Sequence, residues 1–222
     1  WENAEREFQR AFELNPSNGS YWYWHANLLG AVGRMEEAIV LLEEGLKYDP
    51  LNIYMNMHMG LTLFTAGHYS EAEEAYQRAI ELEPSLAMAR SSLGLVYHFQ
   101  GRTDEGLREL VRGVEESERS QWSLWFLGST YADLGRREEA EALLSEMIER
   151  RKHGFMFNTF IASIHALMGR KEEAFRWLDL AFEEREFGLA GWGLHLPSWT
   201  FRGLEDDPRF TEILDRVREA AQ

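Results

Sequence analysis

Apolar residues recur at helical spacing along the chain, most clearly between Ile53 and Leu86. The first half of this stretch predicts a helix from about Tyr54 to Thr65. A second helix is expected from near Tyr69, and its apolar stripe consists of Tyr76, Ala79, Ile80 and Leu82. The stretch therefore predicts a hairpin of two helices.

The residues between and after these helices predict how each one ends. Gly67 follows the first helix, where glycine tolerates a left-handed C-terminal cap. Ser70 is expected to be the N-cap of the second helix, with Glu73 completing a capping box. Ala72 is expected where the two helices cross closely, and Pro84 ends the second helix.

The same pattern returns every thirty-four residues. Glycines superpose at this spacing, at Gly33, Gly67, Gly101, Gly135 and Gly169. Five residues after each glycine stands a small residue: Ala38, Ala72, Gly106, Ala140 and Ala174. A fixed period of this length predicts a solenoid of stacked hairpins, because one hairpin cannot bury its own apolar face.

These positions resemble the tetratricopeptide (TPR) repeat, whose pattern contains Leu-Gly, Tyr, Gly, Ala, an aromatic residue, Ala and Pro. The best repeat supplies Met59-Gly60, Leu63, Gly67, Ala72, Tyr76, Ala79 and Pro84. The repeat at 121 supplies Leu127-Gly128, Tyr131, Gly135, Ala140, Leu144 and Met147. The resemblance covers roughly residues 1–186. It implies an all-α, right-handed solenoid of TPR helix hairpins that works as a non-catalytic protein-interaction scaffold.

The repeat register predicts the organisation of the chain. The TPR array spans 1–186, with a half repeat at 1–18 and repeats at 19–52, 53–86, 87–120, 121–154 and 155–186. After Phe187 the period is expected to break, and 187–222 forms an irregular segment and a C-terminal capping helix. Asp207 suits the N-cap of that helix and Pro208 its first turn. Because the chain begins with Trp1 in mid-repeat, we expect a piece of a longer protein.

Two segments have special features. The repeat at 87 is expected to be the least stable, since Gly106 and Gly113 each lower helix propensity by about 1 kcal/mol relative to alanine. The tail, with Pro197, Trp199 and Leu204 before the Asp207 helix, resembles the C-terminal tail of bacterial TPR regulatory proteins. This second resemblance implies a bacterial multidomain regulator, which we expect to be cytoplasmic.

Composition narrows the classes of partner. The net charge of −15 argues against nucleic-acid binding, which needs basic patches. Cysteine is absent, so disulfides and cysteine-ligated metals are excluded. The sequence has no apolar run long enough for a transmembrane helix, so no membrane insertion is expected.

We expect no catalytic residues, metal or cofactor, and therefore not an enzyme. The run MNMHM at 55–59 contains soft metal ligands, but residues two apart on a helix diverge, which favours structural packing. No H-E-x-x-H, phosphate-binding loop or G-x-S-x-G motif occurs. The basic run 150–152 fits a docking site, or else cations at a helix C-terminus, and we favour the helix interpretation.

The TPR resemblance implies that the first helices line a concave groove. Carried over position by position, the predicted peptide-binding residues are Tyr23, Asn27, Tyr54, Met57, Leu61, Phe64, Met88, Leu95, His98, Trp122 and Trp125. Only Asn27 matches the carboxylate-clamp subclass, so an apolar or aromatic peptide, or a neighbouring domain, is the expected partner. Three alternatives stay open: these residues pack against neighbouring helices, residues 188–205 fill the groove, or the chain self-associates through the open helix at 2–15.

Overall fold

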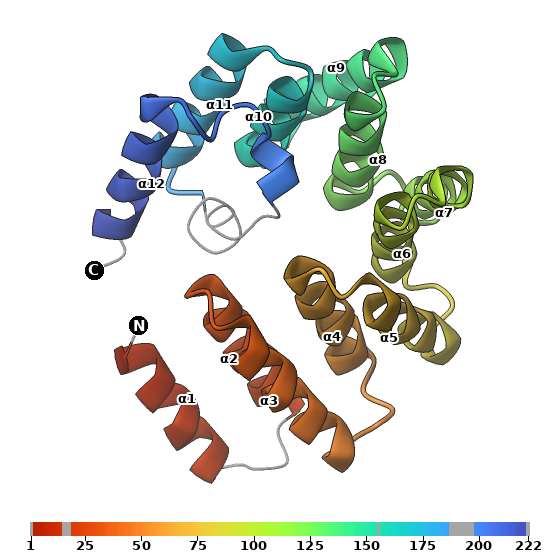
Figure 1. Cartoon of the computed structure of the whole chain (residues 1–222), viewed down its shortest axis with the longest axis vertical. Coiled ribbons are helices and arrows are strands. Elements are labelled where there is room, and N and C mark those ends of the chain that lie inside the picture. The colour runs from red at the N-terminus through yellow and green to blue at the C-terminus, as the bar shows by residue number, and fades with distance from the viewer. Residues whose placement is uncertain (1, 15–18, 155, 187–197, 221–222) are drawn as a thin grey trace. The chain divides into compact units, whose positions relative to one another are not determined.

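The computed structural model describes residues 2–14, 19–154, 156–186 and 198–220, and this part of the chain contains helices and turns but no strand (Figure 1). Contacts between residues divide the chain into two compact units, an N-terminal unit Trp1–Glu109 and a C-terminal unit Leu110–Gln222. The predicted fold class, an all-α solenoid of TPR hairpins, is confirmed. The division into individual repeats stays a prediction.

The N-terminal unit alternates first and second helices of successive hairpins. The first helices are α2 (Gly19–Ala31), α4 (Ile53–Ala66) and α6 (Ala87–Phe99). The second helices are α1 (Glu2–Leu14), α3 (Met35–Tyr48), α5 (Tyr69–Leu82) and the start of α7 (Thr103–Glu116). From α1 to α6 each helix packs against the next, and α2 also packs against α4, so the hairpins stack as the period predicts.

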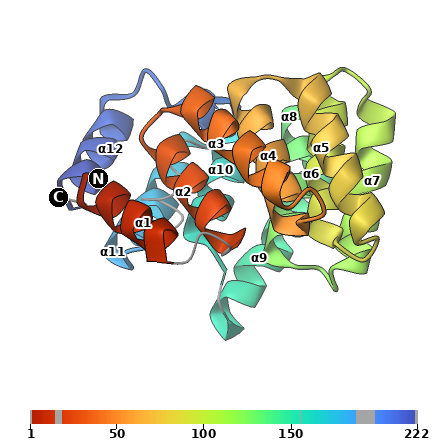
Figure 2. The ribbon, with the colours of Figure 1, turned by 90° about the horizontal axis from the view of Figure 1, so that it is seen from below.

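The C-terminal unit contains the end of α7 and the remaining helices, which are α8 (Gln121–Asp133), α9 (Arg137–His153), α10 (Asn158–Leu167), α11 (Lys171–Glu183), the 3₁₀ helix η2 (Ser198–Phe201) and α12 (Pro208–Ala220). Helix α9 has 17 residues, whereas α3, α5 and α7 have 14 each. The helix that follows it, α10, has only 10 residues, so the junction between these two helices lies about one turn later than in the other repeats. Figure 2 shows the end of α9 extending beyond the other helices of this unit.

The predicted glycine turns are confirmed. At Gly67 the backbone has a φ of 85°, in the left-handed region. Its N–H donates to the carbonyl oxygen of Phe64 at 3.0 Å, and the N–H of His68 donates to that of Leu63 at 2.8 Å. This pair of bonds satisfies carbonyls at the end of α4, and the turns at the other four periodic glycines also have positive φ.

The predicted capping box at Ser70 is wrong. Helix α5 begins at Tyr69 with His68 as its N-cap, and no side chain caps it. The chain enters the helix directly from the Gly67 turn, so Ser70 already lies inside the first turn. Glu73 instead accepts hydrogen bonds from Gln100 and Arg102.

Gly106 lies at a close crossing of α6 and α7. A Cβ atom at this position would lie 2.6 Å from the carbonyl oxygen of Gly94 and 3.0 Å from the amide nitrogen of His98. Both neighbours are backbone atoms, so the helices would have to separate. The glycine that the sequence marked as a weakness is therefore needed for close packing.

Replacing Gly106 with alanine is expected to lower the free energy of unfolding by about 2 kcal/mol, because overpacking outweighs the gain in helix propensity. Urea unfolding followed by circular dichroism measures the change. The sign of the change in the free energy of unfolding distinguishes overpacking from helix propensity, because propensity alone predicts that Gly106→Ala is more stable than the wild type.

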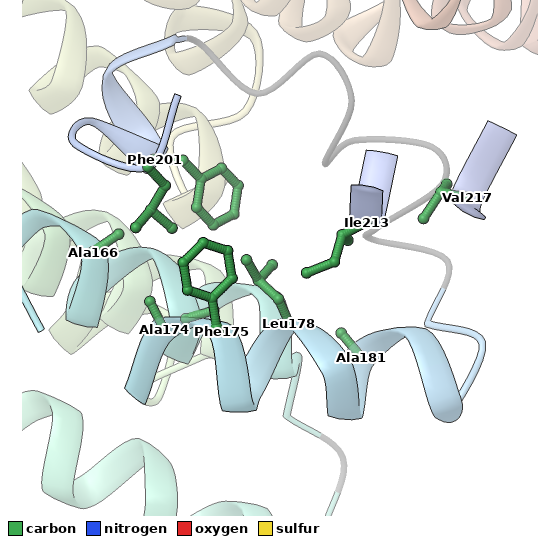
Figure 3. Close-up of a cluster of buried hydrophobic side chains, with 10 residues drawn as sticks. Ala166, Ala174, Phe175, Leu178, Ala181, Phe201, Ile213 and Val217 are labelled. Carbon is green, nitrogen blue, oxygen red and sulfur yellow. The ribbon is translucent and has the colours of Figure 1, made fainter. Parts of the chain in front are cut away.

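The C-terminal tail caps the array with an apolar cluster, drawn in Figure 3. Phe201 and Leu204 join Ile213 and Val217 of α12 on one side of it. On the other side lie side chains of α10 and α11: Ala162, Ala166, Ala174, Phe175, Leu178 and Ala181. The predicted capping helix is thus present. Its predicted N-cap is confirmed, since Asp207 Oδ1 accepts a hydrogen bond from the Arg209 amide at 3.1 Å.

The expected break in the period after Phe187 needs a correction at Gly203. Gly203 lies thirty-four residues after Gly169 and also has a positive φ, of 88°. The 3₁₀ helix η2 packs against α10 just before this turn, and α12 packs against α11 after it. The end of the tail therefore keeps the phase of the repeats. The predicted irregular segment at 187–197 lies outside the described residues.

Candidate functional site

The first helices of the N-terminal unit are almost free of charge. Helices α2 and α4 contain no Asp, Glu, Lys or Arg, and α6 contains only Arg90. Arg90 is 7% exposed, and its Nη1 lies 2.9 Å from a carboxylate oxygen of Glu109. The acidic charge of this unit therefore lies on the second helices and the turns, and the first helices present an uncharged surface.

An aromatic patch, defined here as Tyr23, Trp24 and Tyr54, lies on α2 and α4. The rings of Trp24 and Tyr54 lie 5.5 and 6.0 Å from that of Tyr23, measured between centroids. Trp24 is 50% exposed and Tyr54 is 56% exposed. Sequence reasoning selected Tyr23 and Tyr54 but missed Trp24. The run of aromatic residues at 21–24 was the available signal.

The buried His58 packs against Tyr23 of the aromatic patch. Its ring stacks on Tyr23 with centroids 4.8 Å apart, and its Nδ1 lies 3.2 Å from Asn27 Oδ1. Burial lowers the pKa of His58 to about 4. The imidazole is thus neutral at pH 7 and donates its Nδ1 proton to Asn27, so it fixes the predicted site residues Tyr23 and Asn27 without adding charge.

The other predicted groove residues differ in exposure. Met57, Leu61, Met88, His98 and Trp122 are partly buried. Phe64 is 7% exposed and packs against the rings of Tyr69 and Phe99, while Leu95 is 4% exposed. Buried residues of this kind shape the surface above them but offer little area to a partner. The assignment of the eleven residues to a peptide-binding groove stays a prediction.

Trp125 lies inside the C-terminal unit. It is 3% exposed, and its ring stacks on Phe160 with centroids 4.1 Å apart and an interplanar angle of 2°. Its Nε1 donates to Ser163 Oγ at 2.7 Å. Trp125 thus joins α8 to α10. Trp122, 4.7 Å from Phe160 between centroids, is the more accessible of the two tryptophans.

The run at 55–59 packs as expected. Met55 and Met59 are 0% and 7% exposed, and His58 faces Asn27. Within the described ranges, no three His, Cys, Asp or Glu side chains gather to hold a metal ion. His165, on α10, is buried at 6% exposure. None of the described helices is long and apolar enough to cross a bilayer.

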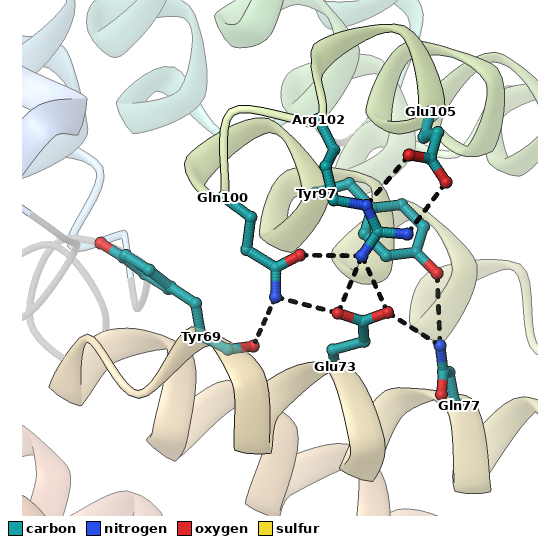
Figure 4. Close-up of polar contacts among 7 residues, drawn as sticks. All are labelled: Tyr69, Glu73, Gln77, Tyr97, Gln100, Arg102 and Glu105. Atoms are coloured by element: carbon teal, nitrogen blue, oxygen red, sulfur yellow. Dashed lines mark hydrogen bonds and ion pairs between the residues drawn. The ribbon is translucent and has the colours of Figure 1, made fainter.

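An arginine clamp joins successive second helices, which sequence reasoning missed (Figure 4). Arg102, directly after the Gly101 turn, lies 3.0 Å from Glu73 of α5 and 2.9 Å from Glu105 of α7. Burial acts to raise the pKa of Glu73, but hydrogen bonds from the side chains of Gln100 and Arg102 hold that pKa below its usual value. The clamp thus ties one hairpin to the next.

The clamp recurs at two other junctions. Arg34 lies 2.5 Å from Glu5 and 2.6 Å from Glu37, and Arg170 lies 2.6 Å from Glu141. In each case the arginine follows a turn glycine, and a glutamate stands twenty-nine residues earlier. That spacing was the signal in the sequence.

A pocket of about 600 Å³ lies between the α7–α8 turn, the start of α8 and the extra turn of α9. Trp122 and Met156 give it an apolar wall, and its charged lining includes Arg119, Arg150 and Glu149. Arg150 belongs to the basic run at the end of α9, where we favoured the helix-terminus interpretation. Its Nη1 donates to the carbonyl oxygen of Arg119 at 3.0 Å, so it also braces the turn.

Two consecutive residues of that turn, Glu118 and Arg119, have left-handed φ values of 51° and 61°. The Arg119 amide donates to the Val114 carbonyl at 2.9 Å, a bond that usually accompanies a glycine cap. The junction between α7 and α8, at 117–120, contains neither proline nor glycine, and it is therefore a tight turn made without glycine.

Replacing Glu118 with glycine is expected to raise the free energy of unfolding by about 1 kcal/mol, because glycine adopts this conformation without steric cost. Chemical denaturation measures the gain. Glu115→Gly, inside the last turns of α7, is the matched control and should instead destabilise the chain. Equal losses in both variants would contradict the expectation.

Comparisons with known proteins agree with this architecture. Models of the tetratricopeptide repeat match residues 19–50, 60–101 and 97–185. The small glutamine-rich tetratricopeptide repeat-containing protein 2 of Mycosarcoma maydis is 34% identical over 82 residues, which cover 37% of this chain. This match spans only 23% of the length of that relative.

Solved structures show the same fold at low identity. A thermophilic TPR protein of Thermus thermophilus has a TM-score of 0.64 and 19% identity, over 90% of this chain and 99% of that one. A TPR protein of Parabacteroides merdae has a TM-score of 0.57 and 16% identity, over 97% and 91% of the two chains. YrrB, described as a TPR protein with an unusual peptide-binding site, has a TM-score of 0.50 and 22% identity, over 82% and 95%. The bacterial origin inferred from the tail stays a prediction.

Proposed function

The chain belongs to the tetratricopeptide repeat family, and we propose that it is a non-catalytic binding module that takes an apolar or aromatic peptide segment on its first helices. The segment belongs to a partner protein or to a neighbouring domain. In the N-terminal unit the proposed contact surface is the aromatic patch. Met57 and Leu61, which follow Tyr54 on α4 and are partly buried, extend it.

The exposure of the patch is the observation that carries this proposal. In a chain of net charge −15, α2 and α4 have no charged side chain, and they leave Trp24 and Tyr54 half exposed. Tyrosine and tryptophan supply large contact areas at low entropic cost and dominate the energetics of many interfaces. An uncharged aromatic surface fits an apolar peptide better than a charged one.

Selection of peptides from a random display library on the full chain tests the proposal. Selected peptides should be rich in aromatic and aliphatic residues, and Trp24→Ala with Tyr54→Ala should weaken them by roughly tenfold or more. Tyr48→Ala, which removes a 78% exposed tyrosine of the second helix α3, is the matched control and should bind normally. Peptides that bind all variants equally would count against the patch.

Self-assembly through α1 is the second candidate. Leu14 at the end of α1 is 78% exposed, whereas Phe8 and Phe12 pack against rings of α2. Light scattering over a hundredfold range of concentration tests this function. A mass that rises with concentration and returns to the monomer in Leu14→Glu supports self-assembly, and a monomer throughout removes it.

A further inference from the structure

In the pocket between the α7–α8 turn and the end of α9, two arginines pair with the same glutamate. A purely apolar peptide would make no use of these charges. Arg119 Nε donates to Glu146 Oε1 at 2.8 Å, and Arg150 Nε lies 3.0 Å from the same carboxylate. Two guanidinium groups thus share one anion. Glu149 is paired at 2.6 Å with Lys152 and at 3.4 Å with His153.

The two arginines keep donors for a further acceptor. A guanidinium has five N–H groups. Arg119 uses Nε and Nη2 for Glu146, and Arg150 uses Nε for Glu146 and Nη1 for the Arg119 carbonyl. Nη1 of Arg119 and Nη2 of Arg150 form no hydrogen bond or ion pair with another described residue. Their side chains are both 43% exposed, so a ligand can reach them.

The apolar wall lies in the same pocket. Trp122 is partly exposed, and its ring is held by Phe157 at 5.7 Å and Phe160 at 4.7 Å between centroids. Met156, which is 4% exposed, also belongs to the lining. A bound group can therefore place an apolar side chain against Trp122 while a negative group reaches the arginines.

The backbone at this place is unusual on both sides of the pocket. The left-handed pair Glu118 and Arg119 forms one side, and the end of α9, which runs three residues further than α3, α5 and α7, forms the other. Left-handed conformations of residues other than glycine are costly, and they concentrate at binding sites.

We propose that this pocket binds an acidic side chain, aspartate or glutamate, that lies next to an apolar side chain in a peptide. The apolar side chain packs on Trp122, and the carboxylate accepts hydrogen bonds from Arg150 and Arg119. This inference rests on the proposed function and deepens it, because it gives the partner a charge at one defined place.

Blocked dipeptides test the proposal without a known partner. The ligands are acetyl-Phe-Glu-amide, acetyl-Phe-Gln-amide and acetyl-Phe-Lys-amide, added at millimolar concentration to the ¹⁵N-labelled chain. The glutamate peptide should shift the indole N–H signal of Trp122 at the lowest concentration of the three, and Trp122→Phe identifies that signal by its loss. The glutamine peptide should bind at least about fivefold more weakly and the lysine peptide not at all. Equal shifts by the three peptides, or none by the glutamate peptide, overturn the proposal.

Variants separate the charge from the packing. Arg150→Gln should weaken the glutamate peptide at least about fivefold, and Glu118→Gln should strengthen it about threefold by removing an opposing charge. Arg176→Gln, on α11 outside the pocket lining, is the control and should have no effect. An unchanged affinity in Arg150→Gln overturns the role of the arginine, provided that the spectrum elsewhere is that of the wild type.

The outcomes also distinguish this pocket from the aromatic patch. If dipeptides fail to bind while library peptides still require Trp24 and Tyr54, the proposed function stands and the pocket does not. If the glutamate peptide binds but the patch variants retain every library peptide, the pocket stands and the patch does not.

Discussion

Replacing Trp125 with alanine is expected to lower the free energy of unfolding of the C-terminal unit by about 3–5 kcal/mol. The indole is 3% exposed and stacks on Phe160, so its loss leaves a cavity between α8 and α10. The hydrogen bond to Ser163 Oγ is lost as well. Urea unfolding followed by fluorescence and circular dichroism measures the change.

Trp125→Phe is the graded control for this prediction. It keeps an aromatic ring against Phe160 but removes the Nε1–H donor, so it should cost about 1–2 kcal/mol and lie between the wild type and Trp125→Ala. If Trp125→Ala loses less than about 1 kcal/mol, the packing described here is not what stabilises the α8–α10 contact. Loss of peptide binding in Trp125→Ala would say nothing about a groove, because the variant is destabilised.

The stability of the C-terminal unit is expected to decrease by about 3 kcal/mol as the pH rises from about 4.5 to about 7, because of Glu186. This side chain is 8% exposed and accepts hydrogen bonds from the amide and the hydroxyl of Thr159, both at 3.2 Å. Burial raises the pKa of Glu186 to about 7, although these hydrogen bonds and one from the Asn158 backbone act against it.

The sign follows from the two pKa values. In the unfolded chain Glu186 loses its proton near its ordinary value of 4.5, whereas in the folded chain it keeps the proton until about pH 7. The folded state therefore binds more protons between these values, and its advantage is lost as the pH rises through them. Glu184 lies nearby and raises the pKa further, while itself paired with Arg151.

Glu186→Gln tests this directly. The amide cannot ionise, so the variant should match the wild type near pH 4.5 and exceed it by up to about 3 kcal/mol at pH 8. Hydrogen exchange of the α10 amides between pH 5.5 and 8.5 follows the trend above the pI of 4.9. Glu183→Gln, an exposed neighbour on α11, should leave the pH dependence unchanged. Parallel curves for Glu186→Gln and the wild type would show that Glu186 is not the source.

Periodicity predicted the fold because each hairpin depends on local signals. The turn at Gly67 needs a residue that accepts positive φ, and the crossing at Ala72 needs a small side chain, so both are visible in one repeat. The start of α5 near Tyr69 was predicted correctly, but its N-cap was misjudged at Ser70, since a helix that leaves a glycine turn directly needs no serine cap.

The candidate site was less predictable, because exposure depends on residues that are distant in sequence. The positional rule placed Trp125 on a surface, but Phe160 of the next hairpin covers it. The same rule passed over Trp24, which is half exposed in the structure. Likewise the period placed Gly106 at the crossing position, but the Gly94 carbonyl that leaves no room for alanine there becomes visible only in three dimensions.

The phase of Gly203 has a consequence for engineering. Because this turn follows Gly169 at the same interval that separates the earlier turn glycines, one further thirty-four-residue cassette inserted between two such turns would return the chain to the same rotational setting. The contacts of η2 and α12 would then re-form on the inserted hairpin if it reproduced the apolar residues of α10 and α11. The protein could therefore be lengthened by whole hairpins, and η2 and α12 would close the end of the last hairpin in each case.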